Sequence, residues 1–469
     1  MLIVFCYNKN GDDMNKELLE ELLTLALSTG ADFAEIYYEN RKRNNFNVTS
    51  SKLDNISSNI SRGVGVRIFK DKEYFYSSSN IITPNYLRKM IRNLVKNIKD
   101  KSNKKVKLNS IENKSQLVKI PHHKFDNAMK KQILLEVDDK IRKTYKEVTQ
   151  VAVSFLENSR EFVVANSEGK YVKSNSCHTR YVCQVYTEKK GVKEKEFYSF
   201  GRSMGYEFLD EIDIIEKSLS TAKIAVEKLY AQDFKGGELP VVIAPGFGAV
   251  IFHEACGHGL EATSVAPKTS VFSNLKGRKI ASDKVTLIDD GTIPGEWGSS
   301  VIDDEGETTK KNILIEKGIL KNYLVDRFNE SSMRQRRNGC GRRQSYNYAP
   351  TSRMSNTYLA PGNDTFEDMI KSIKLGVYCE RMSGGSVNPA TGDFNFAVDT
   401  AILIKDGKLT DRIKGITLIG NSLEVLKNVE MVSSDLVLSD GYCGSKSGMI
   451  HVTIGQPTIK ISKILVGGK

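Results

Sequence analysis

The apolar residues in the first part of the chain recur with two different periods. Between Met14 and Ser28 the leucines follow the three-to-four-residue spacing of an amphipathic helix, and Gly30 marks its end. The segment Gly63–Tyr76 is rich in valine, isoleucine and aromatic residues on either side of Lys70–Lys72, which predicts a β-hairpin. A second helix is expected from about Pro84 to Lys99.

A similar order of elements recurs further along the chain. The pattern predicts a helix, then strands, then a long helix, at Asn127–Lys146, Val148–Leu156, Glu161–Asn166, Thr179–Thr187 and Leu209–Tyr230. Residues 14–235 are therefore expected to form one N-terminal α+β domain, and the repeated order suggests an internal duplication. Residues 1–13 do not join this pattern, and we interpret them as a disordered or wrongly assigned start.

The pattern changes after Lys235-Gly236-Gly237, which we interpret as a linker. Glycines and short apolar segments dominate from there on, and helical periodicity is confined to Gly246–Glu261 and about Thr365–Leu375. Stretches with a strand-like pattern include Lys311–Asp326, Ala397–Leu409 and Met449–Leu465. The sequence therefore predicts an α+β fold, in which residues 236–469 form a mostly β domain that carries a few helices, among them the one at Gly246–Glu261.

Composition and charge set broad limits on the class of protein. The chain has 469 residues, of which 39% are hydrophobic and 27% charged, so we expect two or three globular domains. The net charge is +12, but the lysines are scattered and form no basic stripe, so we expect surface lysines rather than a nucleic-acid-binding face. No apolar run is long enough to predict a transmembrane helix. Seven widely spaced cysteines without a C-x-x-C pair indicate a reducing, cytoplasmic location.

Residues with metal-binding and acid–base chemistry concentrate in one short segment, His253-Glu254-Ala-Cys-Gly-His258. It contains two of the six histidines, with a carboxylate directly after the first. Neutral imidazoles are good ligands of Zn²⁺. An adjacent glutamate can accept a proton from a metal-activated water and pass it to a leaving amine. This combination predicts a metal site with Glu254 as its general base.

The spacing of the two histidines constrains the helix that carries them. In the common H-E-x-x-H motif the histidines are four residues apart and share one helix face, whereas His253 and His258 are five apart. On a regular helix they would lie roughly 140° apart. Both can reach one metal only where the helix is unwound, widened into a π-bulge or ending, and Gly257 and Gly259 would ease such a distortion. We therefore predict an irregular helix between His253 and His258.

A catalytic zinc site needs a third protein ligand and an open fourth position. Cys443 is the leading candidate, because it lies in the glycine-rich segment Gly441–Gly448 between strand-like stretches, and a metal-bound thiol is deprotonated. Two other candidates remain open. Cys256 lies three residues after His253, although a buried cysteine is more often a small core residue. His451 lies eight residues beyond Cys443, where it could equally be a histidine on a strand face.

Other functions fit the sequence less well. Gly246-Phe-Gly248 follows a strand and opens a helix, as in a dinucleotide-binding fold, but Ile251 stands where the third glycine of that motif belongs. Two histidines five residues apart could also be ordinary core or surface residues. The protein would then be a non-catalytic scaffold or binding module.

Several segments of the chain occur in the order typical of one known family. They are His253–Ala262, Asp289–Thr292, Asp303–Gly306, Gly341–Tyr346, Arg353–Thr357, Gly441–Gly444 and Gly455–Pro457. With these segments the sequence resembles the TldD/PmbA family of zinc-dependent peptidases, also called modulators of DNA gyrase, and is most similar to its catalytic, TldD-type branch. The resemblance covers about residues 240–460, and Gly30–Glu35 also looks like the opening of that family.

This resemblance implies one zinc ion per active subunit, bound by His253, His258 and Cys443, with Glu254 as the base. It also implies a dimer, either with a PmbA/TldE-like paralogue or with a second copy, that admits short or unfolded peptides. The PmbA-type subunit lacks the His-Glu…His set, and a scaffold of that kind is the alternative function. The segment after the cysteine departs from the family's usual C-G-K-x-G-Q, because it reads Cys443-Gly-Ser-Lys-Ser-Gly. Any role for the lysine and the glutamine of the family motif therefore stays open in this chain.

Two charged segments are further candidates for function. Arg342 and Arg343 are candidate substrate-binding residues, because guanidinium groups suit carboxylate and backbone acceptors, with structural ion pairs as the alternative. Asp303, Asp304 and Glu305 are expected to form a solvated acidic turn rather than a cation site. The strand-rich C-terminal half suggests that an extended peptide binds by strand addition.

Overall fold

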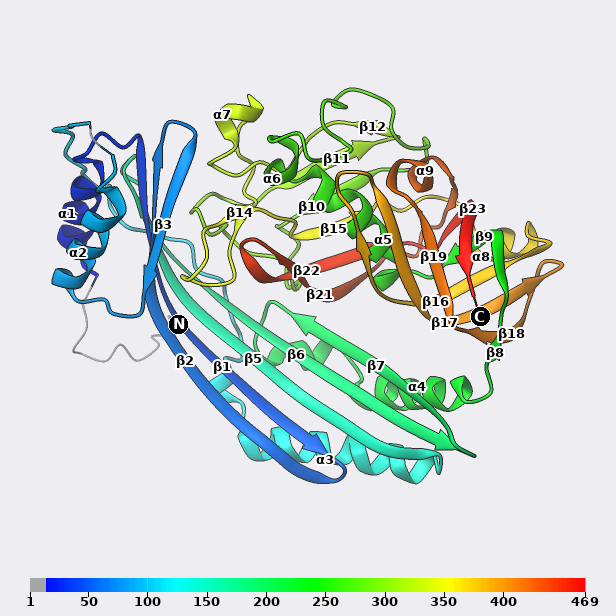
Figure 1. The fold of residues 1–469 in the computed structure, drawn as a ribbon. Coiled ribbons are helices and arrows are strands. Elements are labelled where there is room, and N and C mark those ends of the chain that lie inside the picture. Colours follow the sequence, from blue (N-terminus) through cyan, green and yellow to red (C-terminus); the bar gives the residue numbers. More distant parts are fainter. Residues whose placement is uncertain (1–13, 99, 469) are drawn as a thin grey trace.

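A computed structural model describes residues 14–98 and 100–468 of the chain (Figure 1). It confirms the α+β fold, with helices and strands mixed in the N-terminal region and a largely β C-terminal region. The expectation for residues 1–13 lies outside the described residues. No helix in the described ranges is long and apolar enough to cross a membrane.

The N-terminal region is built on one seven-stranded sheet with the order β3-β2-β1-β5-β6, and both β7 and β4 pair with β6. Figure 1 shows the long central strands as a curved layer. The strands are β1 Phe33–Thr49, β2 Lys52–Lys70, β3 Glu73–Ser79, β4 Glu112–Asn113, β5 Val148–Asn166, β6 Tyr171–Lys189 and β7 Val192–Arg202. The hairpin predicted at Gly63–Tyr76 is confirmed as part of β2 and β3. The sequence predicted two strands where β5 is one, because the polar residues Glu157–Arg160 keep pairing with β1 and β6.

Two pairs of helices pack at opposite ends of this sheet. They are α1 Lys16–Leu27 with α2 Pro84–Val95, and α3 Asn127–Thr144 with α4 Ile214–Lys228. The four predicted helices are therefore confirmed, with shorter bounds for α2 and α4. Helix α4 begins at Ile214 because the side chain of Asp213 caps it by accepting from the backbone N–H of Glu216. The order of one helix, three strands and one helix recurs in the two halves, and the duplication stays a prediction.

The C-terminal region contains an eight-stranded sheet that closes on itself. Strands β16, β9, β23, β19 and β17 pair in that order, and β16 also pairs with β17 to complete a ring. These strands are β9 Gly236–Ile243, β16 Leu375–Val387, β17 Asp393–Lys405, β19 Ile416–Asn421 and β23 Ile459–Gly467, joined by β8 Gln232–Asp233, β18 Lys408–Lys414 and β20 Val429–Val432. The predicted linker was wrong at Gly236 and Gly237, because both lie in β9 and pair with β23.

A second sheet lies beside the ring and carries part of the predicted site. Its order is β12-β11-β10-β15-β22-β21. The strands are β10 Leu287–Asp290, β11 Lys311–Glu316, β12 Ile319–Leu320, β15 Asn356–Leu359, β21 Val437–Ser445 and β22 Gly448–Gln456, with a separate pair β13 Gly341–Arg342 and β14 Thr351–Ser352. Short helices connect these strands: α5 Val250–Phe252, α6 Ala262–Val265, α7 Glu330–Met333, α8 Phe366–Lys371 and α9 Ser422–Lys427.

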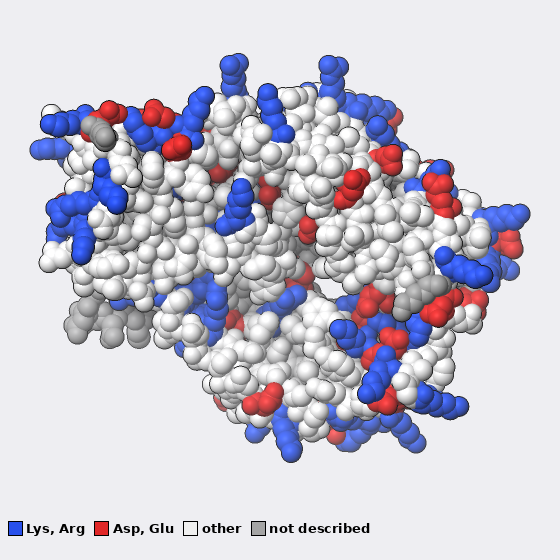
Figure 2. Space-filling view, viewed as in Figure 1, with Lys and Arg blue, Asp and Glu red and all other residues white. Residues whose placement is uncertain are grey.

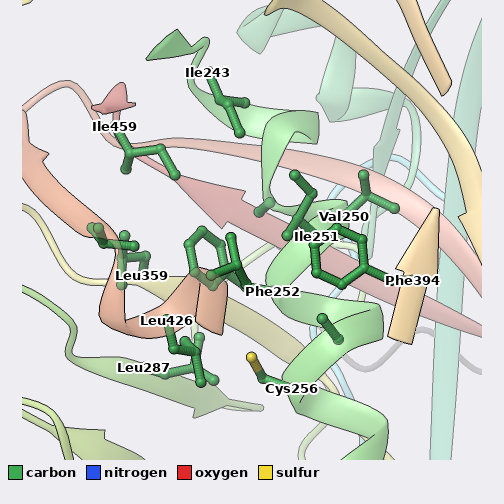
Figure 3. Close-up of a cluster of buried hydrophobic side chains, with 14 of the residues drawn as sticks. Ile243, Val250, Ile251, Phe252, Cys256, Leu287, Leu359, Phe394, Leu426 and Ile459 are labelled. Carbon is green, nitrogen blue, oxygen red and sulfur yellow. The ribbon is translucent and has the colours of Figure 1, made fainter. Parts of the chain in front are cut away.

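The core between the ring and the second sheet fixes the helix that bears the two histidines. Ile251 and Phe252 of α5 are buried in one apolar cluster with Ile243 of the ring and Leu287 of the second sheet (Figure 3). Burying side chains of this size contributes about 1.5–3 kcal/mol each. The helix is therefore held rigidly, and its His–Glu segment continues from this anchored end.

The acidic segment Asp303–Glu305 connects the two regions. The sequence predicted a solvated turn here, and this was wrong, because all three side chains are buried. Glu305 forms an ion pair of 2.6 Å with Arg67 of β2, and Asp304 one of 2.7 Å with Arg160 of β5. The carboxylates of Asp304 and Glu305 can be buried because arginines from the N-terminal sheet neutralise them, whereas Asp303 accepts from backbone N–H groups.

Candidate metal centre

Two histidine side chains meet across an irregular stretch of helix. After α5 the chain forms a π-helical turn, His253–Gly257, and then a 3₁₀ turn, His258–Leu260. The backbone N–H of His258 donates to the carbonyl of His253, five residues earlier. A π turn is wider than an α turn, so residues five apart come to share one face. This confirms the irregular helix that the histidine spacing predicted.

Cys443 brings a third ligand atom to the two histidines. Its Sγ lies 3.2 Å from Nε2 of His253 and 3.0 Å from Nε2 of His258. The ligand atoms of these three residues all lie within 4.8 Å of one another. The structure thus brings the three predicted ligands together, although 190 residues separate His253 from Cys443.

The spacing of these atoms fits a tetrahedral zinc ion. Zn–S bonds of about 2.3 Å and Zn–N bonds of about 2.0 Å place sulfur and nitrogen ligands roughly 3.5 Å apart at tetrahedral angles. The separations here are a few tenths of an ångström shorter, so small shifts of the side chains would admit the ion. Two imidazoles and one thiolate also leave one coordination position open, as catalytic zinc sites require.

The electrostatics of the cluster favour a thiolate at Cys443. Burial alone would raise the pKa of this thiol, but His253 and His258 outweigh it and lower the pKa to about 3. Burial also opposes a charge on His258, yet the carboxylate of Glu261 and the sulfur of Cys443 hold the pKa of His258 well above its usual value. A thiolate is the form of cysteine that binds metal. Metal binding would therefore release a proton from His258.

Two buried polar residues orient the ligands. Oε2 of Glu261 lies 3.2 Å from Nδ1 of His258, which directs the other ring nitrogen toward the cluster. Arg353 donates to the backbone carbonyl of Cys443 at 2.7 Å, and its Nε lies 3.6 Å from Glu261. Arg353 therefore ties the β21–β22 hairpin to the histidine segment.

Neither of these orienting residues was expected at the site from the sequence. Glu261 gave a usable signal, because it follows His258 by three residues and such pairs are neighbours on a helix. Arg353 gave none, because 90 residues separate it from Cys443.

Glu254, the predicted general base, lies beside the cluster. Its Oε2 is 3.8 Å from Nε2 of His258, and its side chain is 28% exposed. The carboxylate therefore lies close to one of the three proposed ligand atoms and still meets solvent. One water molecule can be shared between a carboxylate at this distance and the open coordination position.

The two other candidate ligands lie elsewhere. Cys256 is buried in the same apolar cluster as Phe252 and Leu287 (Figure 3), and burial raises the pKa of its thiol. His451 pairs with Tyr442 in the β21–β22 hairpin, one position away from Cys443. Successive residues of a strand point to opposite faces, so His451 faces the N-terminal sheet, where its ring stacks on that of His178 at 4.0 Å.

The two candidate substrate-binding arginines are both engaged by protein groups. Arg343 is buried and forms an ion pair with Glu35 of β1 at 2.6 Å. The sequence had offered such a structural ion pair as the alternative to substrate binding. Arg342 donates to the backbone carbonyls of Met354 and His451, and it lines a small cavity of about 40 Å³ between the two regions. A substrate contact by either residue stays a prediction.

Family models match most of the chain. The models are described as PmbA/TldA metallopeptidase domain 1, central domain and C-terminal domain, and they match residues 34–98, 120–232 and 236–468. The chain belongs to the PmbA/TldD metallopeptidase family. The resemblance seen in the sequence is thereby confirmed.

Curated relatives support the same assignment over nearly their whole length. The chain is 34% identical to a metalloprotease TldD homolog of Buchnera aphidicola, with 93% of each chain covered. It is 26% identical to a zinc metalloprotease TldD homolog of Saccharolobus solfataricus, with 94% of this chain and 97% of that protein covered. The chain is thus similar to proteins that are named metalloproteases.

Solved structures share the fold. TldE from Thermococcus kodakarensis superimposes with a TM-score of 0.74 at 21% identity, covering 96% of this chain and 100% of that chain. A proposed modulator of a DNA gyrase from Thermotoga maritima superimposes with a TM-score of 0.78 at 16% identity, covering 96% and 99%. At these identities the likeness concerns the fold alone.

Proposed function

We propose that this protein is a zinc-dependent peptidase that hydrolyses short or unfolded peptides. The single observation that carries the proposal is the convergence of His253, His258 and Cys443, with the carboxylate of Glu254 beside them. The names of the relatives, among them a zinc metalloprotease, support the same reaction class. The non-catalytic scaffold remains the alternative, and nothing in the ligand set favours it.

The residues of the chain have distinct tasks in this reaction. His253, His258 and Cys443 would hold the zinc ion, which as a Lewis acid polarises a carbonyl and lowers the pKa of water to about 7. Glu254 would accept the proton of the attacking water and deliver it to the leaving amine. Glu261 and Arg353 keep the ligands oriented, so the site need not reorganise during the reaction.

Our proposals for the partner and the location rest on the family and on the cysteines. We propose a dimer, with a TldE-like paralogue or a second copy, on the strength of the TldE structure that shares this fold. We place the protein in the cytoplasm, because the six cysteines in the described ranges are all free and buried. Nucleic acid is not a proposed partner, since lysines and arginines are dispersed on the face shown in Figure 2 and acidic residues lie among them.

Replacing the proposed base tests the peptidase reaction. Glu254→Gln keeps the shape of the side chain but cannot accept a proton, so kcat for short unstructured peptides should fall by about 10²–10⁴-fold. The zinc content, measured by elemental analysis, should stay near one ion per subunit. An exposed carboxylate of the same region provides the matched control, Glu316→Gln, which should retain full activity.

Two results would reject the proposed function. Full activity of the Glu254→Gln protein would remove Glu254 from the chemistry. A wild-type protein that binds no zinc and cleaves no peptide, alone or with a co-purified partner, would favour the scaffold alternative.

A further inference from the structure

The β21–β22 hairpin turns one apolar face toward the two proposed histidine ligands. Cys443 pairs with Ile450, and both side chains lie on this face. Two residues before Cys443, Gly441 pairs with Val452 on the same face. Cys443, Ile450 and Val452 are buried together in a small cluster that is separate from the main core. Gly441 has no side chain and is partly exposed, so the face has a gap beside the proposed ligand Cys443.

The ring of Phe247 borders this gap. A Cβ on Gly441 would lie 3.8 Å from Cγ2 of Val452 and 4.0 Å from Cε2 of Phe247, which are ordinary contact distances. The phenyl ring and the valine methyl group therefore enclose the space that a side chain at position 441 would take. The side chain of Phe247 is nevertheless 36% exposed. A partly open space with such walls suits an apolar group.

Gly246 allows the segment that carries Phe247 to approach β21 closely. Phe247 lies in the 3₁₀ turn Gly246–Ala249, directly before the helix that leads to the histidines. Gly246 has a φ of +79°, and a Cβ there would lie 2.8 Å from Oγ of Ser439 and 3.2 Å from Cγ1 of Val437. Glycine permits both the left-handed backbone and the close approach. The turn can therefore pack on β21 with the ring of Phe247 beside the gap.

The gap lies within reach of a peptide bound at the metal centre. Two residues of a strand span about 7 Å, so Gly441 is separated from Cys443 by roughly this distance along β21. Successive residues of an extended peptide are about 3.3 Å apart, so a side chain one or two residues from the scissile bond would reach Phe247. Single exposed apolar residues are common on protein surfaces. Phe247 differs from them because it adjoins the proposed reaction centre on the same face of the hairpin.

We propose that Phe247, Gly441 and Val452 form a subsite for one apolar side chain of the substrate peptide. This inference rests on the proposed peptidase function and adds a preference to it. Peptides with an apolar residue within two positions of the scissile bond should be cleaved best. Binding removes both the apolar side chain and the ring of Phe247 from water, which is favourable. Glycine and charged residues would leave the ring exposed or lose their own hydration, so they should occupy the subsite poorly.

A peptide with a single leucine tests the subsite in the zinc-loaded protein, together with any co-purified partner. In a nonapeptide of serine and glycine residues with leucine at its centre, we expect one main cut within two residues of the leucine, identified by mass spectrometry. Moving the leucine by two positions should move the cut by two. Replacing the leucine with alanine should lower kcat/KM roughly tenfold or more. Cuts whose position does not depend on the leucine would overturn the proposal.

Two variants change the subsite without replacing a proposed ligand. Phe247→Ala removes one wall, and Gly441→Ala places a methyl group in the gap, so both should lower the preference for leucine over alanine, the first roughly tenfold. The zinc content of both should stay near one ion per subunit, by elemental analysis. Tyr86→Ala is the matched control, because Tyr86 is a similarly exposed aromatic residue, at 39%, on the distant helix α2. It should keep the preference, and a Phe247→Ala protein that also keeps it would refute the subsite.

Binding measurements separate a failure of this inference from a failure of the proposed function. If the zinc-loaded wild type cleaves neither the leucine nor the alanine peptide, the peptidase proposal fails, and calorimetry with the Glu254→Gln protein then tests the subsite alone. Tighter binding of the leucine peptide, lost when Phe247→Ala is added, would support the subsite. Equal binding of the two peptides would refute it.

Discussion

Cys256 and Cys443 are both buried, and their surroundings give their sulfur atoms opposite chemistry. Cys256 lies in an apolar cluster, and burial raises its pKa. Cys443 meets two imidazoles, and its pKa falls to about 3 in spite of burial. The sequence alone left both cysteines open as ligands, because Cys256 is close to the histidines along the chain. Only the pairing of β21 with β22 decides which sulfur faces them.

Removing each cysteine in turn tests this difference. Cys443→Ala should lower the zinc content of the purified protein well below one ion per subunit, because one of three ligands is lost. Cys256→Ala should keep its zinc and lose about 1 kcal/mol or more of stability, since it leaves a small cavity in the core. Elemental analysis of both variants measures the zinc content, and thermal melts measure the stability. Retained zinc in Cys443→Ala would disprove its role as a ligand.

At the scale of elements, the π turn was predictable but the reason for its glycines was not. The five-residue spacing required a widened helix, and we expected Gly257 and Gly259 to supply flexibility. Their backbone is not in the left-handed region that favours glycine. A Cβ on Gly257 would instead lie 2.0 Å from Sδ of Met354, and one on Gly259 would lie 2.5 Å from the ring of Phe272. These glycines provide space for neighbouring side chains, which a local pattern cannot reveal.

A methyl group at this turn should therefore disturb the site. Gly257→Ala would push against Met354, and overpacking of this kind costs about 1–3 kcal/mol. We expect a lower melting temperature and weaker zinc binding, measured by calorimetry and by competition with a chelator. Gly384→Ala is the control, because a Cβ there meets no atom within 4 Å. Equal behaviour of the two variants would show that the contact with Met354 does not position the histidines.

The whole molecule depends on contacts between regions that are far apart in the sequence. Hydrophobic periodicity predicted the α+β class and most helices, because it is a local property. The burial of Asp303–Glu305 was missed, since its partners Arg67 and Arg160 are more than 140 residues away. The stack of His178 on His451 joins the same two regions, and the sequence pattern could not predict it either.

Low pH should destabilise the contact between the two regions at His178 and His451. Burial lowers the pKa of His178 and His451 well below the usual value, and nearby guanidinium groups, including that of Arg160, add to the effect. Below pH of about 6.5 the unfolded chain binds protons that the folded protein excludes. Stability is therefore complete above this pH and falls below it, by up to about 1.4 kcal/mol per pH unit for each histidine.

Melting temperatures between pH 7.5 and 5.5 measure this slope. The double variant His178→Phe/His451→Phe should show a smaller decrease than the wild type, because neither phenylalanine titrates. His123→Gln, at an exposed position, should keep the wild-type slope. A double variant as acid-sensitive as the wild type would place the titrating groups elsewhere.

The 190 residues between His253 and Cys443 also impose an order on biosynthesis. A ribosome adds roughly 5–20 residues per second, so both histidines exist for about 10–40 s before the cysteine is made. During that interval the nascent polypeptide has only two of the three proposed ligands. The proposed peptidase site is therefore incomplete while the rest of its own polypeptide, which is still unfolded, is being synthesised.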